Sequence, residues 1–238
     1  MTKRVKKRFT SDVKVIDFQP YLPQKKQRVS ISARNANQKE YLKKLQDDNT
    51  NIVLAIGPAG TGKTMLAVQH GIKLFQEGIV DKIVVTRPAV SVDEDLGFLP
   101  GTLNEKMAPW TRPIFDVLQE YYQAKDIAKM LEEGVIEISP LAYMRGRTFK
   151  NAYIIADECQ NTTVNQMKML LTRLGEGSKM VVTGDLAQAD RMNDNGLIDF
   201  CNLLAGKNLK HIDIIEFDHR DIERHHAVKE ILSIYGDS

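Results

Sequence analysis

The stretch "NIVLAIGPAGTGKTMLAVQHGIKLF" (residues 51–75) joins an apolar β-branched run to an amphipathic helical pattern through a glycine-rich loop. Its centre, "GPAGTGKT", satisfies the pattern G-x-x-x-x-G-K-[ST] at every position, with a strand expected before it and a helix after it. Glycines at such positions allow backbone torsions and a close approach that a Cβ would prevent. The loop N–H groups and the helix N-terminus can then face a phosphate group. The stretch predicts a phosphate-binding loop.

The loop motif assigns a role to each of its residues. Lys63 supplies a positive charge to the β- and γ-phosphate oxygens of a nucleotide, and the Thr64 hydroxyl supplies a ligand to Mg²⁺. We expect the whole loop to contact the nucleotide: Gly57, Pro58, Ala59, Gly60, Thr61, Gly62, Lys63 and Thr64.

The composition indicates one sizeable domain with a basic tail. The 238 residues are 42% hydrophobic and 27% charged, with a net charge of +2, as in a globular protein with a substantial core. Residues 1–36 are polar and basic, so we expect an N-terminal extension there and the nucleotide-binding domain over residues 37–238. The two cysteines show neither disulfide nor metal spacing. No run reaches the ~18 apolar residues of a transmembrane helix, and no secretory signal is recognisable, so we expect a cytoplasmic protein with no membrane partner.

Short apolar runs alternate with helical patterns along this domain. The runs are apolar throughout, which is typical of strands buried on both faces of a parallel sheet: "NIVLAI", "KIVVT", "VIEIS", "YIIAD", "KMVVTG" and "HIDIIEF". Helical patterns fall at residues 63–76, 110–132, 165–174, 196–204 and 221–235. The alternation predicts an α/β fold with helices on both faces of the sheet and ligands at the carboxyl ends of the strands.

Two carboxylates stand at one of these strand ends, in "AYIIADECQN". We expect Asp157 to hold Mg²⁺ with Thr64, directly or through water, and Glu158 to polarise an attacking water. An Asp-Glu pair is common on protein surfaces, but its place at the end of a buried strand favours the catalytic role.

Two glutamines complete the predicted site. Gln188, in "VVTGDLAQAD", has an amide that can bond both a γ-phosphate and a moving segment; the alternative is an ordinary turn capped by Asp185. Gln38 lies upstream of the loop, where its amide can donate to and accept from an adenine edge at once. Alternatively, Gln38 is a solvent-facing residue in the first turn of a helix.

Gln38, the loop, "DECQ" at 157–160 and "GDLAQ" at 184–188 together resemble the first RecA-like domain of superfamily 1 helicases. More narrowly, three segments are similar to the PhoH family of phosphate-starvation-inducible ATPases: "TRPAVSVDEDLGFLPGTLNEKMAPW", "ISPLAYMRGRTFKNAYIIADECQ" and "FDHRDIERHHAVKEIL". The resemblance covers about residues 37–235. It implies a P-loop NTPase with a RecA-like parallel sheet, ATP and Mg²⁺ as cofactors, ATP hydrolysis and ring assembly.

The sequence departs from the family pattern at three places. Cys159 stands where the usual motif has alanine, and Ala156 replaces the customary leucine before Asp157. The segment "ADRMNDNG" after Gln188 differs from the family pattern, so no role is transferred to that loop. The short chain is similar to phage-encoded members.

The chain has room for one RecA-like lobe, whereas a two-lobed helicase supplies an arginine to the bound ATP from its second lobe. Such arginines raise rates by ~10³–10⁵ in GTPases. We therefore expect a homo-oligomer, a hexameric ring by analogy, in which a neighbouring subunit supplies the arginine. Arg224 is the preferred candidate. Each alternative could instead form a surface ion pair or a structural clamp: Arg87, Arg145, Arg147 and Arg220.

Residues 88–122 look too long and loop-rich for a simple strand-to-helix connection. Phe98, Trp110 and Arg112 could stack on single-stranded nucleic acid there, or could instead form a subunit interface. We expect a Mg²⁺-dependent ATPase that acts on RNA or single-stranded DNA in a helicase-like manner. The alternatives are an ATP-gated oligomeric scaffold without motor activity and, less favoured because Glu158 and Gln188 suit attack by water, a small-molecule kinase.

Overall fold

The computed structural model describes residues 28–88, 103–189 and 194–223, together with positions 227, 228, 231 and 234; the side chains of residues 103–110 are not described. The basic run at the N-terminus, Phe98, the Trp110 side chain and Arg224 therefore lie outside the described residues, and their predicted roles stay predictions.

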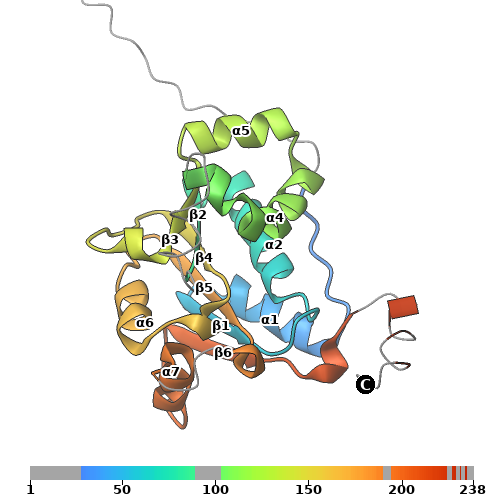
Figure 1. Ribbon diagram of the computed structural model, residues 1–238, viewed down its shortest axis with the longest axis vertical. Helices are drawn as coiled ribbons and strands as arrows, with labels where there is room; N and C mark the ends of the chain where they lie inside the picture. Colours follow the sequence, from blue (N-terminus) through green and yellow to red (C-terminus); the bar gives the residue numbers. More distant parts are fainter. Residues whose placement is uncertain are drawn as a thin grey trace, which may run out of the picture.

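Six parallel strands form one sheet in the order β3-β2-β4-β5-β1-β6 (Figure 1). They are β1 (Ile52–Ile56), β2 (Lys82–Arg87), β3 (Ile136–Pro140), β4 (Ala152–Ala156), β5 (Lys179–Gly184) and β6 (Ile212–Glu216). The predicted parallel α/β sheet is confirmed. Because β5 lies between β1 and β4, the phosphate-binding loop and the Asp157-Glu158 pair are separated by one strand, and the end of β5 faces both.

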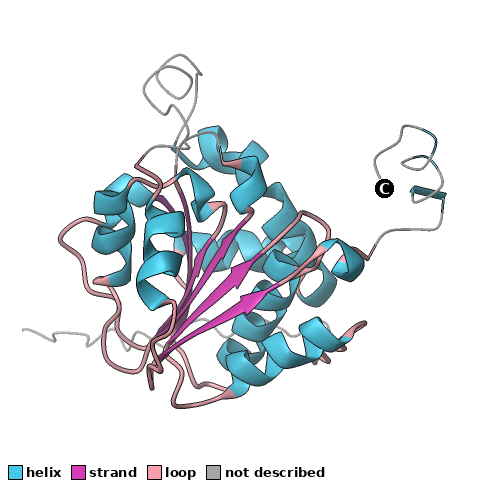
Figure 2. Cartoon of the chain, turned by 90° about the horizontal axis from the view of Figure 1, so that it is seen from below, coloured by secondary structure: helices cyan, strands magenta, loops and turns pink. Residues whose placement is uncertain are grey.

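Helices cover both faces of this sheet (Figure 2). One face carries α1 (Ala36–Gln46), α2 (Lys63–Gln76), α4 (Leu103–Tyr121) and α5 (Ala124–Glu132), and the other carries α6 (Val164–Leu171) and α7 (Gly196–Leu204). Along β1, Val53 and Ala55 join the first core, whereas Ile52, Leu54 and Ile56 join the second. This alternation across a strand that is apolar throughout explains why its sequence has no polar face.

Four 3-10 turns follow the strands at one edge of the sheet, after β3, β4, β5 and β6 respectively: η1 (Leu141–Met144), η2 (Cys159–Asn161), η3 (Leu186–Gln188) and η4 (His219–Asp221). These turns and the loop after β1 all lie at the carboxyl edge of the sheet, because the strands are parallel. The fold therefore brings the predicted site segments to one edge.

The single helix expected over residues 110–132 is wrong, because α4 and α5 are separate helices. The chain turns at Tyr122, which is 1% exposed, and at Gln123, an extended N-cap residue. The turn lets α4 pack on α2 while α5 packs on β3. The apolar period runs through the turn, so the sequence pattern does not reveal it. Helix α4 also begins at Leu103, within the stretch expected to be mostly loop.

Packing begins upstream of the boundary predicted at residue 37. Val29, Ile31 and Ala33 are partly buried and pack against the core beneath α1 and α2. None of the helices in the described part of the chain combines the length and apolar character needed to cross a membrane.

Candidate active site

The loop from Gly57 to Thr64 connects β1 to α2 in a conformation that requires glycine. Gly57 has a φ of 139°, and a Cβ added there would lie 2.3 Å from the carbonyl oxygen of Phe217. Gly62 has a φ of 83° and precedes the first residue of α2. The backbone is fixed from both sides, since Gly57 N–H donates to Gly184 O at 3.1 Å and Glu223 N–H donates to Gly60 O at 3.0 Å.

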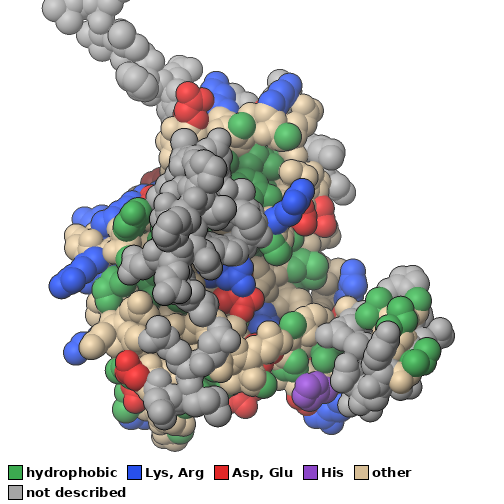
Figure 3. Space-filling model, in the orientation of Figure 1, with side chains coloured by type: hydrophobic (Ala, Val, Ile, Leu, Met, Phe, Trp, Pro, Cys, Tyr) green, Lys and Arg blue, Asp and Glu red, His purple; other side chains and the backbone are tan. Residues whose placement is uncertain are grey.

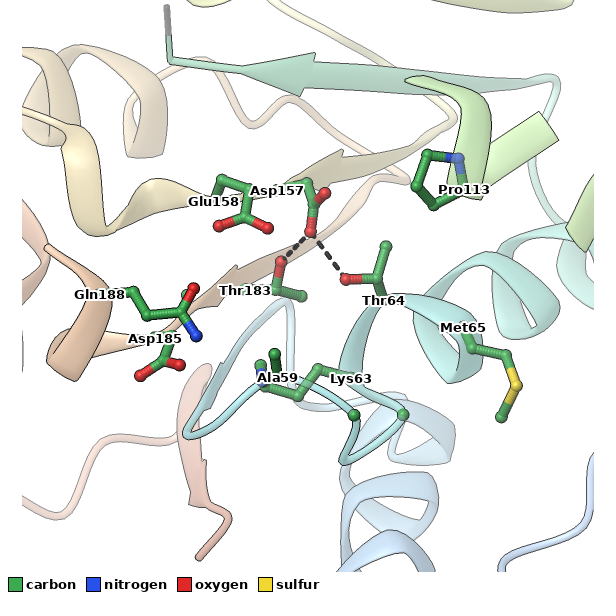
Figure 4. A pocket seen from close by; sticks show the side chains of 13 residues that line it. Ala59, Lys63, Thr64, Met65, Pro113, Asp157, Glu158, Thr183, Asp185 and Gln188 are labelled. Atoms are coloured by element: carbon green, nitrogen blue, oxygen red, sulfur yellow. Dashed lines mark hydrogen bonds between the residues drawn. The ribbon is translucent and has the colours of Figure 1, made fainter. Parts of the chain in front are cut away.

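A cavity of about 410 Å³ opens beside this loop (Figure 4). Its walls come from the loop, α4 and the ends of β4 and β5: Ala59, Gly60, Gly62, Lys63, Thr64, Met65, Pro113, Asp157, Glu158, Thr183, Gly184, Asp185 and Gln188. Most predicted site residues therefore meet around one cavity. Met65, Pro113 and Thr183 also line it, although their sequence context gave no signal of this.

The Lys63 side chain folds back onto the loop that precedes it. Its ammonium group donates to the carbonyl oxygens of Gly57 and Pro58, both at 2.6 Å, and to the Thr61 hydroxyl at 3.3 Å. Burial lowers the pKa of Lys63, while the charges of Asp185, Glu158 and Asp157 act to raise it. Because all three N–H donors are used, a bound phosphate would take the place of one of these acceptors.

Asp157 is held by two hydroxyl groups. Its Oδ1 accepts from the Thr64 hydroxyl at 2.8 Å and from the buried Thr183 hydroxyl at 2.5 Å (Figure 4). Thr183 comes from β5 and was not among the predicted site residues. The hydroxyl and the carboxylate are hard oxygen donors of the kind that Mg²⁺ shares with phosphate oxygens and water. Among the described residues no cluster of three His, Cys, Asp or Glu side chains could hold a metal ion.

Glu158 adopts a left-handed backbone conformation, with φ 56° and ψ 38°. Non-glycine residues seldom adopt this conformation, and it is often found at functional sites. An ion pair joins its Oε1 to Arg87 at 3.0 Å, and its Oε2 accepts from the Gln160 amide at 2.5 Å. The Glu158 carboxylate therefore lies beside the cavity with both of its oxygens engaged.

Gln160 links the ends of two strands. Its side-chain oxygen accepts from Asp185 N–H at 3.2 Å, and its backbone oxygen accepts from the Asn195 side chain at 2.7 Å. Asn195 is also the N-cap of α7. Gln160 is 2% exposed, so it acts inside the protein and ties Glu158 to β5 and α7. Gln160 stood in the "DECQ" motif but was given no role of its own.

The two predicted glutamines differ in their surroundings. Gln188 is exposed at the rim of the cavity, at the end of the turn that Asp185 caps by accepting from Ala187 N–H at 3.1 Å. Gln38 is 1% exposed, so the solvent-facing alternative for it is wrong. Its oxygen accepts from Arg34 N–H at 2.8 Å and its nitrogen donates to Thr61 O at 3.1 Å. Gln38 thus supports the loop through its hydrogen bond to Thr61. Its contact with adenine stays a prediction.

Besides Arg87, which pairs with Glu158, two further candidate arginines make ion pairs within the chain. Arg147 forms a double hydrogen bond with Glu137 and lies over the Phe149 ring, 4.5 Å from its centre. Arg147 is therefore a structural clamp, which was one of the alternatives given for it. Arg220 pairs with Asp218 on the surface, and Arg145 is exposed beyond the end of β3.

Comparison with known proteins shows the family of this chain. A family model described as "PhoH-like protein" matches residues 30–236. The chain belongs to the PhoH family. It is 47% identical over 208 residues to the PhoH-like protein of Bacillus subtilis, with 87% of this chain and 64% of the relative covered. It is 42% identical over 210 residues to Protein PhoH of Escherichia coli, with 87% and 58% covered.

The chain therefore spans 64% and 58% of the lengths of these two relatives. Among solved structures it is similar to a Sulfolobus solfataricus SWI2/SNF2 ATPase core in complex with dsDNA, at 18% identity and a TM-score of 0.41, over 70% of this chain and 34% of that one. It is also similar to domain III of the Thermotoga maritima replication initiation protein DnaA, at 14% identity and a TM-score of 0.36, over 84% and 69%. Similarities this weak carry no argument about function.

Proposed function

We propose that this PhoH family member binds ATP with Mg²⁺ and hydrolyses it at the cavity beside the loop. The observation that carries the proposal is that Lys63 and Thr64, at the start of α2, and Asp157 and Glu158, at the end of β4, line one cavity. Family membership supports the same activity.

In this proposal each side chain has a distinct task. The loop N–H groups and Lys63 bind the phosphates, while Thr64 and Asp157 hold Mg²⁺, which neutralises the charge that develops during phosphoryl transfer. Glu158 orients and polarises the attacking water from the end of β4. Thr183 fixes the Asp157 carboxylate, and Gln160 positions Glu158. Gln188, at the rim of the cavity, would contact the γ-phosphate through its amide.

We further propose that the ATPase works as a homo-oligomer, a hexameric ring, on RNA or single-stranded DNA. In this proposal a neighbouring subunit supplies an arginine to the bound ATP, with Arg224 the candidate. Basic side chains gather along the left-hand margin of the face in Figure 3, the side on which β3 and α6 lie in Figure 1, which favours a polyanionic partner.

The test is ATP turnover by a sample of measured oligomeric mass, with and without single-stranded RNA and DNA across a salt titration. We expect Lys63→Ala to lose ATP binding and Glu158→Gln to keep binding but lose turnover by ~10²-fold or more. Unchanged turnover in Lys63→Ala would overturn the site. If neither polymer binds or alters turnover, the ATP-gated scaffold becomes the better account.

A separate experiment tests whether Arg224 acts at the site of a neighbouring subunit. Lys63→Ala and Arg224→Ala subunits should each be inactive alone and should regain turnover when mixed, because a mixed ring contains sites with both residues intact. A mixture that stays inactive although mass measurement shows mixed rings contradicts the arrangement.

A further inference from the structure

Two side chains contact the Glu158 carboxylate, one at each oxygen. Arg87, the last residue of β2, holds Oε1 at 3.0 Å, and the Gln160 amide holds Oε2 at 2.5 Å. The two contacts differ in their surroundings, since Gln160 is 2% exposed, whereas the side chain of Arg87 is 27% exposed. Solvent and solutes therefore reach the guanidinium but not the amide.

These contacts with Arg87 and Gln160 oppose the role proposed for Glu158. A carboxylate that polarises an attacking water is a stronger base when no nearby cation neutralises its charge. Here one oxygen faces a guanidinium and the other accepts from an amide. The contact with Arg87 has to be given up, at least in part, before Glu158 can act on water at full strength.

The Arg87 contact is also the more easily broken of the two. A partly exposed ion pair contributes little free energy, so a competing anion can displace it. A guanidinium binds phosphate with the same planar fork of donors that it offers to a carboxylate. The Gln160 contact would survive the exchange, because Gln160 is fixed by Asp185 and Asn195, and it would keep the freed carboxylate beside the cavity.

We propose that Arg87 is a positioning residue that latches Glu158 in a resting arrangement, and that a backbone phosphate of single-stranded nucleic acid releases it by taking over the guanidinium. This inference rests on the proposed ATPase function and adds to it a route by which a nucleic acid accelerates turnover. The latch joins two strand ends, β2 and β4, that are neighbours in the sheet.

The test measures kcat and KM for ATP in the wild type, Arg87→Ala and Arg87→Lys, alone and with poly(U) or poly(dT). Arg87→Ala should raise the polymer-free kcat about three- to fivefold, the rate equivalent of a partly exposed ion pair, with KM for ATP unchanged. It should also lose most of the stimulation by polymer. Arg87→Lys, which keeps the charge but not the fork, should be intermediate. A purely structural role for Arg87 would not raise kcat.

Lys44→Ala is the matched control, because it removes a 2.7 Å ion pair with Asp213 that lies away from the cavity. Thermal unfolding checks each variant, and Arg87→Gln replaces Arg87→Ala if that variant does not fold. A polymer-free kcat that falls or stays the same in the Arg87 variants overturns the latch.

The remaining outcomes separate the latch from the proposed function. If the polymers stimulate the wild type and Arg87→Ala by the same factor, the latch fails while action on nucleic acid stands. If the polymers do not stimulate the wild type, release by nucleic acid and the proposed partner fail together, although a raised kcat in Arg87→Ala still supports the latch.

Discussion

Thr183 holds the Asp157 carboxylate from a strand that the loop motif does not include. Its buried hydroxyl and that of Thr64 both donate to Oδ1 of Asp157. Two donors on one oxygen orient the carboxylate, and groups that orient a ligating carboxylate strengthen metal binding. The side chain that holds this carboxylate from β5 is thus a buried threonine.

We expect Thr183→Val to raise the Mg²⁺ concentration needed for half-maximal turnover about three- to tenfold, because a hydrogen bond of this kind contributes about 1 kcal/mol. The measurement is a Mg²⁺ titration of ATP turnover. Thr172→Val is the control, since the exposed Thr172 hydroxyl donates to backbone oxygens at the end of α6 and accepts from Arg173, and Thr172 does not line the cavity. An unchanged Mg²⁺ requirement in Thr183→Val would show that Thr183 has no part in the metal site.

Gly57 offers a sharp comparison with Gly78. Both have a positive φ, of 139° and 72°, but a Cβ at Gly57 meets the Phe217 carbonyl at 2.3 Å, whereas a Cβ at Gly78 meets open space. Gly78→Ala should therefore cost only the backbone term of about 1 kcal/mol, and Gly57→Ala should cost at least about 1 kcal/mol more. Urea unfolding of both variants measures the difference, and equal costs would contradict the close approach.

At the scale of elements, the two ends of the described chain meet around the phosphate-binding loop. Asn37 at the start of α1 donates to the buried Asp221 carboxylate in η4 at 2.7 Å, and Asn35 donates to Asp221 O at 3.2 Å. Glu223, just beyond η4, holds Gly60 O. The loop therefore depends on α1 and η4, which are far apart in the sequence.

A double-mutant cycle on Asn37 and Asp221 tests this connection. Asp221→Ala should destabilise the fold by about 1–3 kcal/mol, because it leaves the buried Asn37 amide and Asp218 N–H without their acceptor. The coupling free energy between Asn37→Ala and Asp221→Ala, from urea unfolding, should exceed about 0.5 kcal/mol. ATP affinity should fall along with stability. Additive effects would mean that the two elements do not support the loop together.

At the scale of the whole molecule, a buried histidine makes stability depend on pH. His70 on α2 is 2% exposed and contacts the Tyr153 hydroxyl at 3.2 Å. Burial, with smaller contributions from Lys179 and Lys73, lowers the pKa of His70 from 6.5 to about 3. Between these values the unfolded chain binds a proton that the folded protein does not, so folding stability falls as pH drops below 6.5.

We expect this group alone to remove about 1.4 kcal/mol of stability for each pH unit below 6.5, down to about pH 3. Urea unfolding at several pH values measures the slope. His70→Gln, which cannot titrate, should flatten it, while His211→Gln, at an exposed position, should not. An equal slope in His70→Gln and the wild type would show that other groups govern acid unfolding.

The sequence by itself determined the sheet, the loop and the carboxylates. Runs that are apolar throughout predict parallel strands because both faces of such strands are buried, and α2 and α7 were predicted with the bounds that the structure shows. The loop motif is local, since its glycines, lysine and threonine act within one turn of chain. The family followed from such motifs, and family membership is confirmed.

Only the tertiary structure decided how these parts support one another. The break between α4 and α5, the burial of Gln38 and the hold of Thr183 on Asp157 all depend on contacts between segments distant in sequence. The same is true of Arg87, which from sequence could have been a finger, a surface ion pair or a clamp, and which the sheet order places beside Glu158. Local patterns encode the conformation of a segment, but which side chains meet is fixed by strand order and packing, and those are properties of the folded chain as a whole.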